Sequence, residues 1–362
     1  MSAAQGPGWE VGAERLRCLA RLAARGKRRS AAVARFMLDL DRHVHDLAAD
    51  LAAGTYRPAA GRAFWIRDPK PRLICALPFR DRVAQHLLIE ATLPAIERSL
   101  RPQTYACRRG FGTHAGLRRA ADLARTHAFV LRVDVRRFFP SRDHAVRRRL
   151  LDHTTPPPWR WLRDRFLDAP AQVERVVQHF PGDDLLTPLA RPHGLPIGSL
   201  TSQIWANVYL APIDHLLAAH LGLGTFVRYC DDLLVFHDDP GRLRAALAAI
   251  RDRALELRLR LHPTKTRRHR TSDPVPFLGF VLRRRGQGVQ VRLRHENVRR
   301  MRGRMRVVRA LFACGALDVE EVTSRVRAWL AHARHGHTRA LLEAELARLT
   351  FTRGDESPEA RS

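Results

Sequence analysis

Short apolar segments and polar breaks alternate through the middle of the chain. The apolar segments at residues 226–228 and 233–236 flank four more polar residues, 229–232. Two such segments joined by a short polar stretch are typical of a tight β-hairpin. We therefore predict that Asp231 and Asp232 lie together at the tip of a hairpin.

A further strand is indicated at residues 130–135, where the polarity of the side chains alternates. This alternation places Leu131, Val133 and Val135 on one face of the strand and Asp134 on the other. Together with the hairpin, the pattern predicts three carboxylates at strand positions.

Helical periodicity dominates both ends of the chain. Residues 1–54 are predicted to form a mostly helical extension that ends at Gly54, and the chain becomes helical and basic again over residues 283–352. Residues 353–362 are predicted to be a frayed tail. The segment between these ends, residues 55–282, is expected to be the core of the protein.

Strands and helices alternate in that core. Strands are predicted at residues 64–66 and 72–76, followed by a helix over residues 81–93 that Pro94 stops. Another helix is predicted over residues 242–259.

A loop and a helix are predicted between the two groups of carboxylates. Gly198 permits close backbone approach in the loop, and the apolar helix follows over residues 204–217. Either Thr201 or Ser202 can supply the N-cap of this helix.

The chain is strongly basic. It carries 64 lysine and arginine residues against 36 aspartate and glutamate residues, a formal net charge of +28. This excess favours a polyanionic partner and salt-sensitive binding, so nucleic acid is the expected partner. Almost all of the cations are arginine, which a genome rich in G and C would also produce. The sign of the charge is therefore more informative than the choice of arginine.

Composition narrows the class of protein. A hydrophobic content of 45% in 362 residues fits a soluble globular chain with a real core. No apolar run approaches the roughly 18 residues needed to cross a bilayer, and the N-terminus lacks the apolar segment of a signal peptide. We therefore expect a cytoplasmic protein with no membrane partner. The five cysteines show no CxxC spacing, which argues against a disulfide framework or a zinc site.

The three carboxylates have the chemistry of a metal site. Oxygen ligands without histidine or cysteine suit hard cations such as Mg²⁺, and Mn²⁺ could substitute for it. Two such ions about 3.5 to 4 Å apart can activate an attacking hydroxyl and stabilise a leaving oxygen in phosphoryl transfer. The alternative is that Asp231 and Asp232 are ordinary turn residues, since aspartate is common at hairpin tips.

Several motifs occur in a fixed order, at residues 71–85, 131–141, 194–203, 228–232, 261–266 and 277–280. Their sequences and their order resemble the core motifs of reverse transcriptases. The resemblance extends from about residue 55 to the end of the folded chain, and several motifs in the correct order are far more specific than any one of them. It implies an α+β right-hand polymerase with an antiparallel palm sheet and a helical N-terminal extension. Residues 55–282 would then be the fingers and palm, and residues 283–352 the thumb.

Within that family, the chain is most similar to the reverse transcriptases of diversity-generating retroelements, which copy a template RNA with errors at adenines. The similarity lies mainly in residues 196–198 and 202–203. Retroviral, retron and group II intron enzymes usually carry Gln in place of Ile197 and Pro in place of Gln203. Cys230 is a departure, because relatives more often have Ala or Met there.

The resemblance implies that the chain adds dNTPs to the 3′ end of a DNA or RNA primer on an RNA template. Asp134 and Asp231 would bind two Mg²⁺ ions, and Asp232 would tune the field or join the site transiently. The subfamily also implies a small basic accessory protein as a partner.

Lysine is rare in this chain, so each lysine is informative. The only ones are Lys27, Lys70 and Lys265, and the last two lie inside the motifs. A lysine retained among so many arginines suggests a position that needs a compact ammonium. The resemblance places Lys265 near the departing pyrophosphate as a candidate proton donor, and the alternative is a solvated loop cation. Lys70 and Arg72 would lie on a fingers hairpin over the triphosphate, or else form one basic patch among many.

Nucleotide contacts are expected from Phe139 and from the loop around Gly198. The resemblance makes Phe139 a wall against the 2′ position of the sugar, which would favour dNTPs, while Phe138 is expected in the core. Ile197, Gly198 and Gln203 would approach the templating base pair and the incoming nucleotide. Ile197 in place of a hydrogen-bonding Gln fits low fidelity, and the alternative is a simple apolar packing substitution.

Two alternatives stay open on the sequence. A catalytically silent nucleic-acid-binding scaffold would have the same charge and fold, but it has no need of three carboxylates beside an anionic ligand. The other alternative is a group II intron-like or defence-associated reverse transcriptase, which the neighbouring genes would distinguish.

Overall fold

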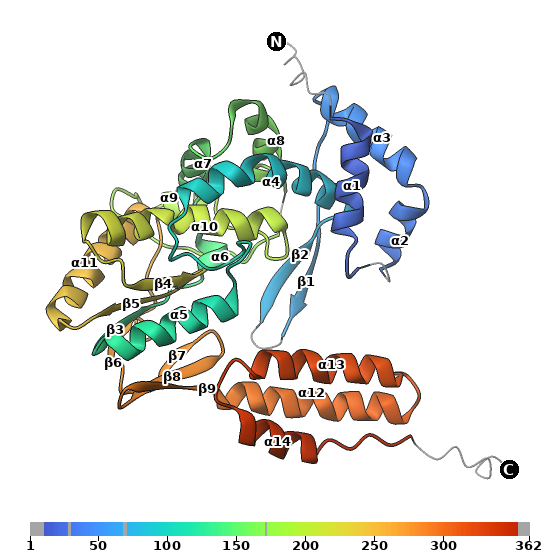
Figure 1. Cartoon of the computed structure of the whole chain (residues 1–362). Coiled ribbons are helices and arrows are strands. Elements are labelled where there is room, and N and C mark those ends of the chain that lie inside the picture. The colour runs from blue at the N-terminus through green and yellow to red at the C-terminus, as the bar shows by residue number, and fades with distance from the viewer. Residues whose placement is uncertain (1–10, 28–29, 68–70, 171, 354–362) are drawn as a thin grey trace.

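A computed structural model describes residues 11–27, 30–67, 71–170 and 172–353 (Figure 1). Lys70 and the tail predicted beyond residue 353 lie outside the described residues. The described part mixes helices with three separate sheets, all antiparallel. None of the helices in it is long and apolar enough to cross a membrane.

Three helices precede the first strand: α1 (Ala13–Ala23), α2 (Ala31–Leu38) and α3 (Leu40–Ala52). Their apolar residues recur at helical spacing, so each helix buries one face. Leu16, Val44 and Leu47 from these faces are fully buried in one core with α4 (Phe79–Ser99). Gly54 follows α3 with a φ of +70°, a conformation that favours glycine, in agreement with the predicted end of the helical segment.

Helix α4 continues through Pro94, where the sequence predicted a stop. A proline inside a helix removes one hydrogen bond and costs about 3 kcal/mol. Beyond it, Ile96 is 1% exposed and Leu100 is 7% exposed in the core with α1 and α3. The predicted stop was wrong because burying such side chains, worth about 1.5–3 kcal/mol each, offsets the break.

The central sheet has the strand order β4-β5-β3-β6. Its strands are β3 (Phe129–Val133), β4 (Phe226–Tyr229), β5 (Asp232–His237) and β6 (Arg267–Arg270). Every neighbouring pair is antiparallel, and β3 and β5 are joined through Leu131 opposite Val235 and Val133 opposite Leu233. The sheet therefore brings the end of β3 next to the start of β5.

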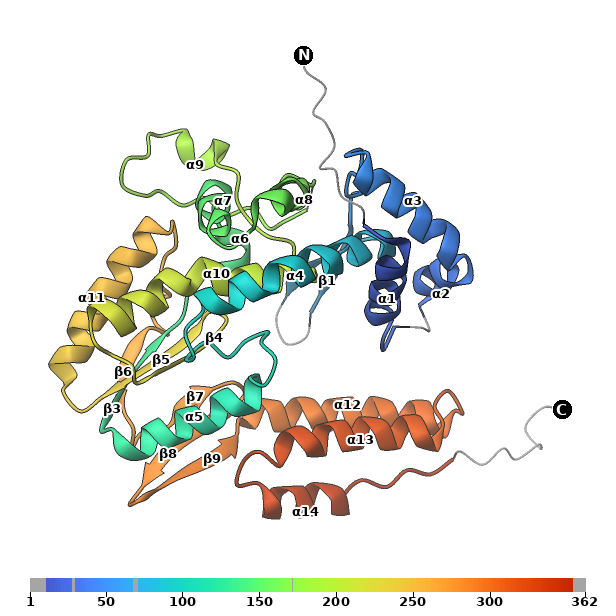
Figure 2. The same ribbon diagram turned by 45° about the horizontal axis from the view of Figure 1, so that its top comes forward.

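Three helices cover the central sheet: α5 (Thr113–Thr126), α10 (Leu200–His215) and α11 (Pro240–Glu256). Leu131, Val133 and Val135 are buried against α10 and α11, on one face as the alternation predicted. Val130 and Leu234 are buried on the opposite face against α5 (Figure 2). Asp134 comes directly after β3, between two residues of the buried face.

A separate hairpin of β1 (Arg62–Ile66) and β2 (Arg72–Ala76) lies beside the central part of the molecule (Figure 1). The observed bounds of β2 are those that the sequence predicted. Cys75 N donates a 2.9 Å hydrogen bond to the carbonyl of Ile197, and Ile74 forms a parallel bridge with Ile197. This hairpin is thus hydrogen-bonded to the loop that precedes α10.

The third sheet consists of β7 (Val275–Phe277), β8 (Phe280–Arg285) and β9 (Gly288–Leu293), and it leads into α12 (His295–Ala313), α13 (Val319–Ala333) and α14 (Arg339–Ala347). The helical part therefore begins at His295, and the prediction of helix from residue 283 was wrong. Val291 and Leu293 alternate with polar residues and are buried, which favours a strand. Gly286, with a φ of +55°, forms the turn between β8 and β9.

The remaining elements are short: α6 (Phe138–Ser141), α7 (His144–Asp152), α8 (Pro157–Leu167), α9 (Thr187–Ala190) and the π-helix η1 (Leu216–His220). Helices α7 and α8 pack beside α4 and α10. They support the loop before α10 from the side away from the central sheet (Figure 2).

Candidate active site

The β4–β5 hairpin has a two-residue turn. Tyr229 pairs with Asp232, so Cys230 and Asp231 form the turn. Asp231 therefore lies at the tip as predicted, but Asp232 is the first residue of β5. Cys230 has a φ of +50°, which is uncommon for a residue with a side chain, and Arg228 Nη1 donates a 3.1 Å hydrogen bond to its carbonyl.

The structure brings Asp134, Asp231, Asp232 and Lys265 together. Val133 pairs with Leu233. The residues that flank this pair, Asp134 and Asp232, therefore lie side by side at the same end of the two inner strands. Lys265 Nζ lies 3.4 Å from both carboxylate oxygens of Asp134. The four predicted catalytic side chains thus lie close together, although they come from three separate segments of the chain.

Backbone hydrogen bonds place Lys265. His262 N donates to the carbonyl of Asp134 at 2.7 Å, and Arg136 N donates to the carbonyl of Arg260 at 2.8 Å. The Thr266 hydroxyl also donates to the carbonyl of Asp134, at 3.2 Å. The position of the lysine therefore depends on a short strand-like pairing and not only on its own ion pair.

The carboxylates work against one another electrostatically. Burial raises the pKa of Asp231 to about 6, and the charges of Asp232 and Asp134 add to this effect. Burial also raises the pKa of Asp232, but Arg132, whose Nη2 lies 3.2 Å from Asp232 Oδ1, opposes the rise. Positive charge at this place would relieve the repulsion.

The donor set fits a hard divalent cation, because it consists of carboxylate oxygens without sulfur or imidazole. Among the described residues, no group of three or more His, Cys, Asp or Glu side chains is arranged to hold a metal ion. Asp134 instead contacts Lys265, and Asp232 contacts Arg132. The ligand chemistry is thus present, and two of the three carboxylates are paired with cations.

A buried network behind the turn was missed by the sequence analysis. Arg228 and Asp214 are 1% and 0% exposed and form a bidentate ion pair, with Nε–Oδ1 and Nη2–Oδ2 distances of 2.7 and 2.6 Å. Arg228 also donates to Asn207 and Thr104, and Thr104 donates to Asp214. An arginine inside an otherwise apolar strand was the available signal. Through Arg228, helix α10 fixes the turn that carries Asp231.

The backbone of the loop before α10 passes close to β2 at Gly198. Its φ is +112°, and a Cβ added there would lie 3.1 Å from Ile74 Cγ2 and 3.2 Å from the carbonyl oxygen of Cys75. Only glycine fits this close approach without strain. Ile197 is half-buried, and its backbone is bonded to β2, so the structure joins the predicted nucleotide loop to the β1–β2 hairpin.

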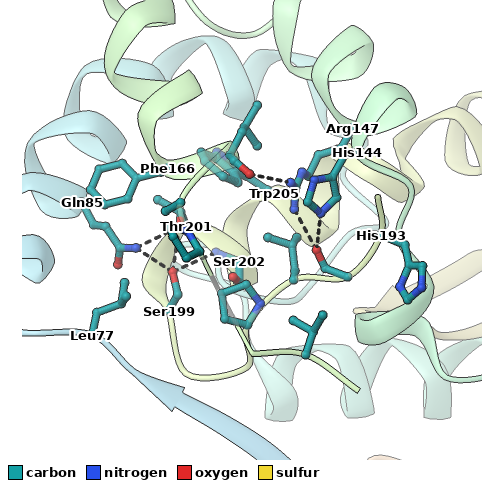
Figure 3. Close-up of a pocket in the computed structure, with 17 residues that line it drawn as sticks. Leu77, Gln85, His144, Arg147, Phe166, His193, Ser199, Thr201, Ser202 and Trp205 are labelled. Atoms are coloured by element: carbon teal, nitrogen blue, oxygen red, sulfur yellow. Dashed lines mark hydrogen bonds between the residues drawn. The ribbon is translucent and has the colours of Figure 1, made fainter. Parts of the chain in front are cut away.

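The N-cap of α10 is Ser199, whose hydroxyl accepts from Ser202 N. The predicted caps, Thr201 and Ser202, were wrong because the helix begins at Leu200, earlier than the apolar pattern suggested. Figure 3 shows that Gln85 from α4 donates to the hydroxyls of Ser199 and Thr201, at 2.8 and 3.2 Å. This buried network fixes the start of the helix against α4.

A small cavity of about 60 Å³ lies beneath this loop, between α4, α7, α8 and α10 (Figure 3). His144 and Arg147 line it, and both bond to the carbonyl oxygen of Gly194, at 3.0 and 3.2 Å. The start of the loop is therefore held from below by α7.

The other predicted nucleotide-binding residues are more dispersed. Phe138 is buried as predicted, and Phe139 is half-buried at the start of α6, where its carbonyl accepts from Leu195 N at 3.0 Å. Arg72 is exposed on β2, and its side chain forms no hydrogen bond or ion pair with another described residue. Gln203 is exposed on α10, with Oε1 3.9 Å from Cys107 Sγ. Phe139 is thus tied to the loop, whereas Arg72 and Gln203 face solvent.

The family comparison agrees with this geometry. The family described as reverse transcriptase (RNA-dependent DNA polymerase) matches residues 67–282, more than half of the chain. A search of curated proteins found no match. The fold and the match define a nucleotidyltransferase with a palm-type polymerase fold. The chain belongs to the reverse transcriptase family, and it is an RNA-directed DNA polymerase with a nucleic acid template, a primer and dNTPs as substrates.

Proposed function

We propose that the chain copies RNA by two-metal-ion nucleotidyl transfer at Asp134, Asp231 and Asp232. The observation that carries the proposal is the meeting of these three carboxylates and Lys265 at the end of β3 and the β4–β5 turn. Reverse transcriptases generally use divalent metal ions, and Mg²⁺ suits these ligands best. When bound, such ions lower the pKa of the primer 3′ hydroxyl and neutralise charge on the triphosphate.

The protein's own residues have distinct parts in this scheme. Asp134 and Asp231 supply the oxygen ligands, and Asp232, held by Arg132, tunes the charge of the site. Lys265 leaves Asp134 and donates a proton to the departing pyrophosphate. Phe139 excludes the 2′ hydroxyl of a ribonucleotide, and the loop at Ile197 and Gly198 lies under the nascent base pair.

The layout that supports these roles is the right hand of a polymerase. We assign the β1–β2 hairpin to the fingers, the central sheet with α10 and α11 to the palm, and α12 to α14 to the thumb. The N-terminal helices up to Gly54 form a separate extension. In this assignment, Arg72 on β2 belongs to the fingers hairpin and contacts the triphosphate.

We further propose that the enzyme serves a diversity-generating retroelement in the cytoplasm, with a small basic accessory protein as partner. Support comes from the apolar Ile197 and from Gln203, which the subfamily resemblance rests on. An isoleucine cannot donate or accept a side-chain hydrogen bond, so it gives a less selective contact than glutamine. Reduced selectivity is the property that such an element needs.

Primer extension on an RNA template with dNTPs and Mg²⁺ tests both levels of the proposal. We expect extension by the wild type, its loss in Asp231→Ala/Asp232→Ala, and its retention in the matched control Asp122→Ala/Asp252→Ala, whose carboxylates are exposed on α5 and α11. Misincorporation opposite template adenines would support the retroelement role. Misincorporation at equal rates opposite all template bases would instead favour a group II intron-like or defence-associated enzyme.

A further inference from the structure

Arg142 is a fully buried arginine that the proposed mechanism does not use. It follows α6 directly and is 0% exposed. The centre of its guanidinium lies 4.6 Å from the ring centroid of Phe138 and 4.4 Å from that of Phe139. Nη1 donates a 3.3 Å hydrogen bond to the carbonyl of Ser202, and Nε and Nη2 have no hydrogen-bond partner in the described part of the chain.

Burial of this guanidinium is costly. It lowers the pKa of Arg142 to about 9, and the charge of Arg147 adds to the effect. The side chain still carries its charge at neutral pH, but no carboxylate pairs with it among the described residues. The guanidinium packs against two aromatic faces and bonds one carbonyl, and the charge of Asp231 favours its charged form without an ion pair. A cation attracts the rings strongly in such a place because water is excluded.

The backbone around Arg142 is hydrogen-bonded to the loop at residues 194–199, which precedes α10 and is here called the nucleotide loop after its proposed role. The carbonyl of Arg142 accepts from Gly194 N at 2.8 Å, and that of Phe139 accepts from Leu195 N at 3.0 Å. The Arg142 side chain then bonds to Ser202, in the first turn of α10. One residue thus connects the ring of Phe139 with the start of the loop at Gly194 and with the first turn of the helix that follows the loop.

We propose that Arg142 is a positioning residue that holds the ring of Phe139 in place and thereby sets the discrimination between dNTPs and rNTPs. The proposal rests on the role of Phe139 in the proposed function. An aromatic wall excludes a 2′ hydroxyl only while its ring cannot turn away. The guanidinium restrains that rotation because it packs on the ring and is itself fixed by Ser202.

The first test measures kcat and KM for dATP and ATP in primer extension by Arg142→Met. Methionine retains much of the apolar stem and removes the guanidinium. We expect the ratio of kcat/KM for dATP over ATP to fall at least tenfold, mainly through a lower KM for ATP, with kcat for dATP changing less than threefold. Arg142→Lys retains a cation over the rings and is expected to recover part of the discrimination. If Arg142→Met does not fold, the ratio is measured for Arg142→Lys, where we expect a smaller fall.

Arg163→Met is the matched control. Arg163 is also buried, but it pairs with Asp152 and Asp164 at α7 and α8 and does not contact Phe139. Its loss is expected to lower stability without changing the dATP over ATP ratio. Equal changes in the ratio for Arg142→Met and Arg163→Met would overturn the proposal, because they would reflect general loosening.

A double-mutant cycle with Phe139→Ala tests whether Arg142 acts through the ring of Phe139. We expect Arg142→Met to have no further effect on the ratio once Phe139 is alanine. A full effect in that background would overturn the role of Arg142 through Phe139. An unchanged ratio in Phe139→Ala alone would overturn both the exclusion of the 2′ hydroxyl by Phe139 and the positioning role of Arg142.

An activity-independent measurement distinguishes failure of this inference from failure of the proposed function. In protein that contains 4-fluorophenylalanine, the ¹⁹F resonance of Phe139 is assigned by its loss in Phe139→Leu. We expect this resonance to shift and narrow in Arg142→Met, as a freed ring would, but not in Arg163→Met. An unchanged resonance would overturn the positioning role of Arg142 even in an active enzyme. A lack of primer extension by the wild type would instead overturn the proposed function.

Discussion

Asp231 is a proposed metal ligand whose negative charge the fold opposes. Burial raises its pKa to about 6, and both neighbouring carboxylates add to the rise. The ionised side chain therefore destabilises the metal-free protein above that pH, and the cost disappears as the pH falls towards the ordinary pKa of about 3.9 in the unfolded chain. This is the sign expected of a site that binds cations.

We expect Asp231→Asn to raise the melting temperature in EDTA at pH 8, because the amide carries no charge. The gain should shrink as the pH falls from 8 to 5, when the wild-type carboxyl takes up a proton. Differential scanning fluorimetry across this range checks the prediction, with the exposed Asp122→Asn as control. A gain of equal size at both pH values would contradict it.

The Arg228–Asp214 pair is the other residue-scale feature with a large expected effect. Asp214→Ala leaves a buried guanidinium without its carboxylate, which typically costs about 3–5 kcal/mol. Urea denaturation should show this loss, whereas Arg228→Met/Asp214→Leu should lose less because no charge remains buried. A double variant less stable than Asp214→Ala would argue against the electrostatic explanation.

At the scale of elements, the sequence predicted what local patterns determine. Strand β2 and the hairpin that carries Asp231 were predicted because alternation or short apolar runs are bounded there by turn residues. The course of α4 through Pro94 and the strands before α12 were mispredicted, because burial against distant segments decided them. Lys265 contacts Asp134 across 131 residues, a contact that periodicity could not predict. The family resemblance implied only that Lys265 lies near the departing pyrophosphate.

Gly198→Ala tests the junction between the β1–β2 hairpin and the loop. The new Cβ would meet Ile74 and Cys75 at a φ of +112°, so we expect a loss of about 1–3 kcal/mol in stability and a raised KM for dNTPs. Gly286→Ala is the matched control, since Gly286 also has a positive φ but no heavy atom within 4 Å of an added Cβ. An equal rise in KM for both variants would contradict a specific role for the junction.

The whole molecule is dominated by positive charge, with a formal net charge of +28. If α12 to α14, which we assign to the thumb, bind the template–primer duplex, exposed arginines of α12 neutralise backbone phosphates. Each contact contributes about 0.7–0.9 to the slope of log K against log salt concentration. The charge itself was evident from the sequence, but its distribution over the helices required the fold.

We expect Arg299→Ala/Arg306→Ala to weaken binding of a template–primer duplex and to make the salt slope shallower by about 1.5. Both residues are exposed on α12. Fluorescence anisotropy at several salt concentrations measures the slope. Arg244→Ala/Arg251→Ala, on α11 at the other end of the molecule, should leave it unchanged (Figures 1 and 2). The same slope change in both double variants would count against the proposed thumb.

Helix α10 is capped by Ser199 at the nucleotide loop and bears Asp214, which holds Arg228 behind the turn of Asp231, near its other end. It therefore fixes the distance between the loop at residues 194–199 and the turn that carries Asp231. Each residue of a helix adds about 1.5 Å and about 100° of rotation. One inserted or deleted residue would swing Asp214 away from Arg228, however conservative its side chain. The length of this helix is accordingly less free to vary than its composition, and insertions that distinguish one such polymerase from another belong in the loops outside it.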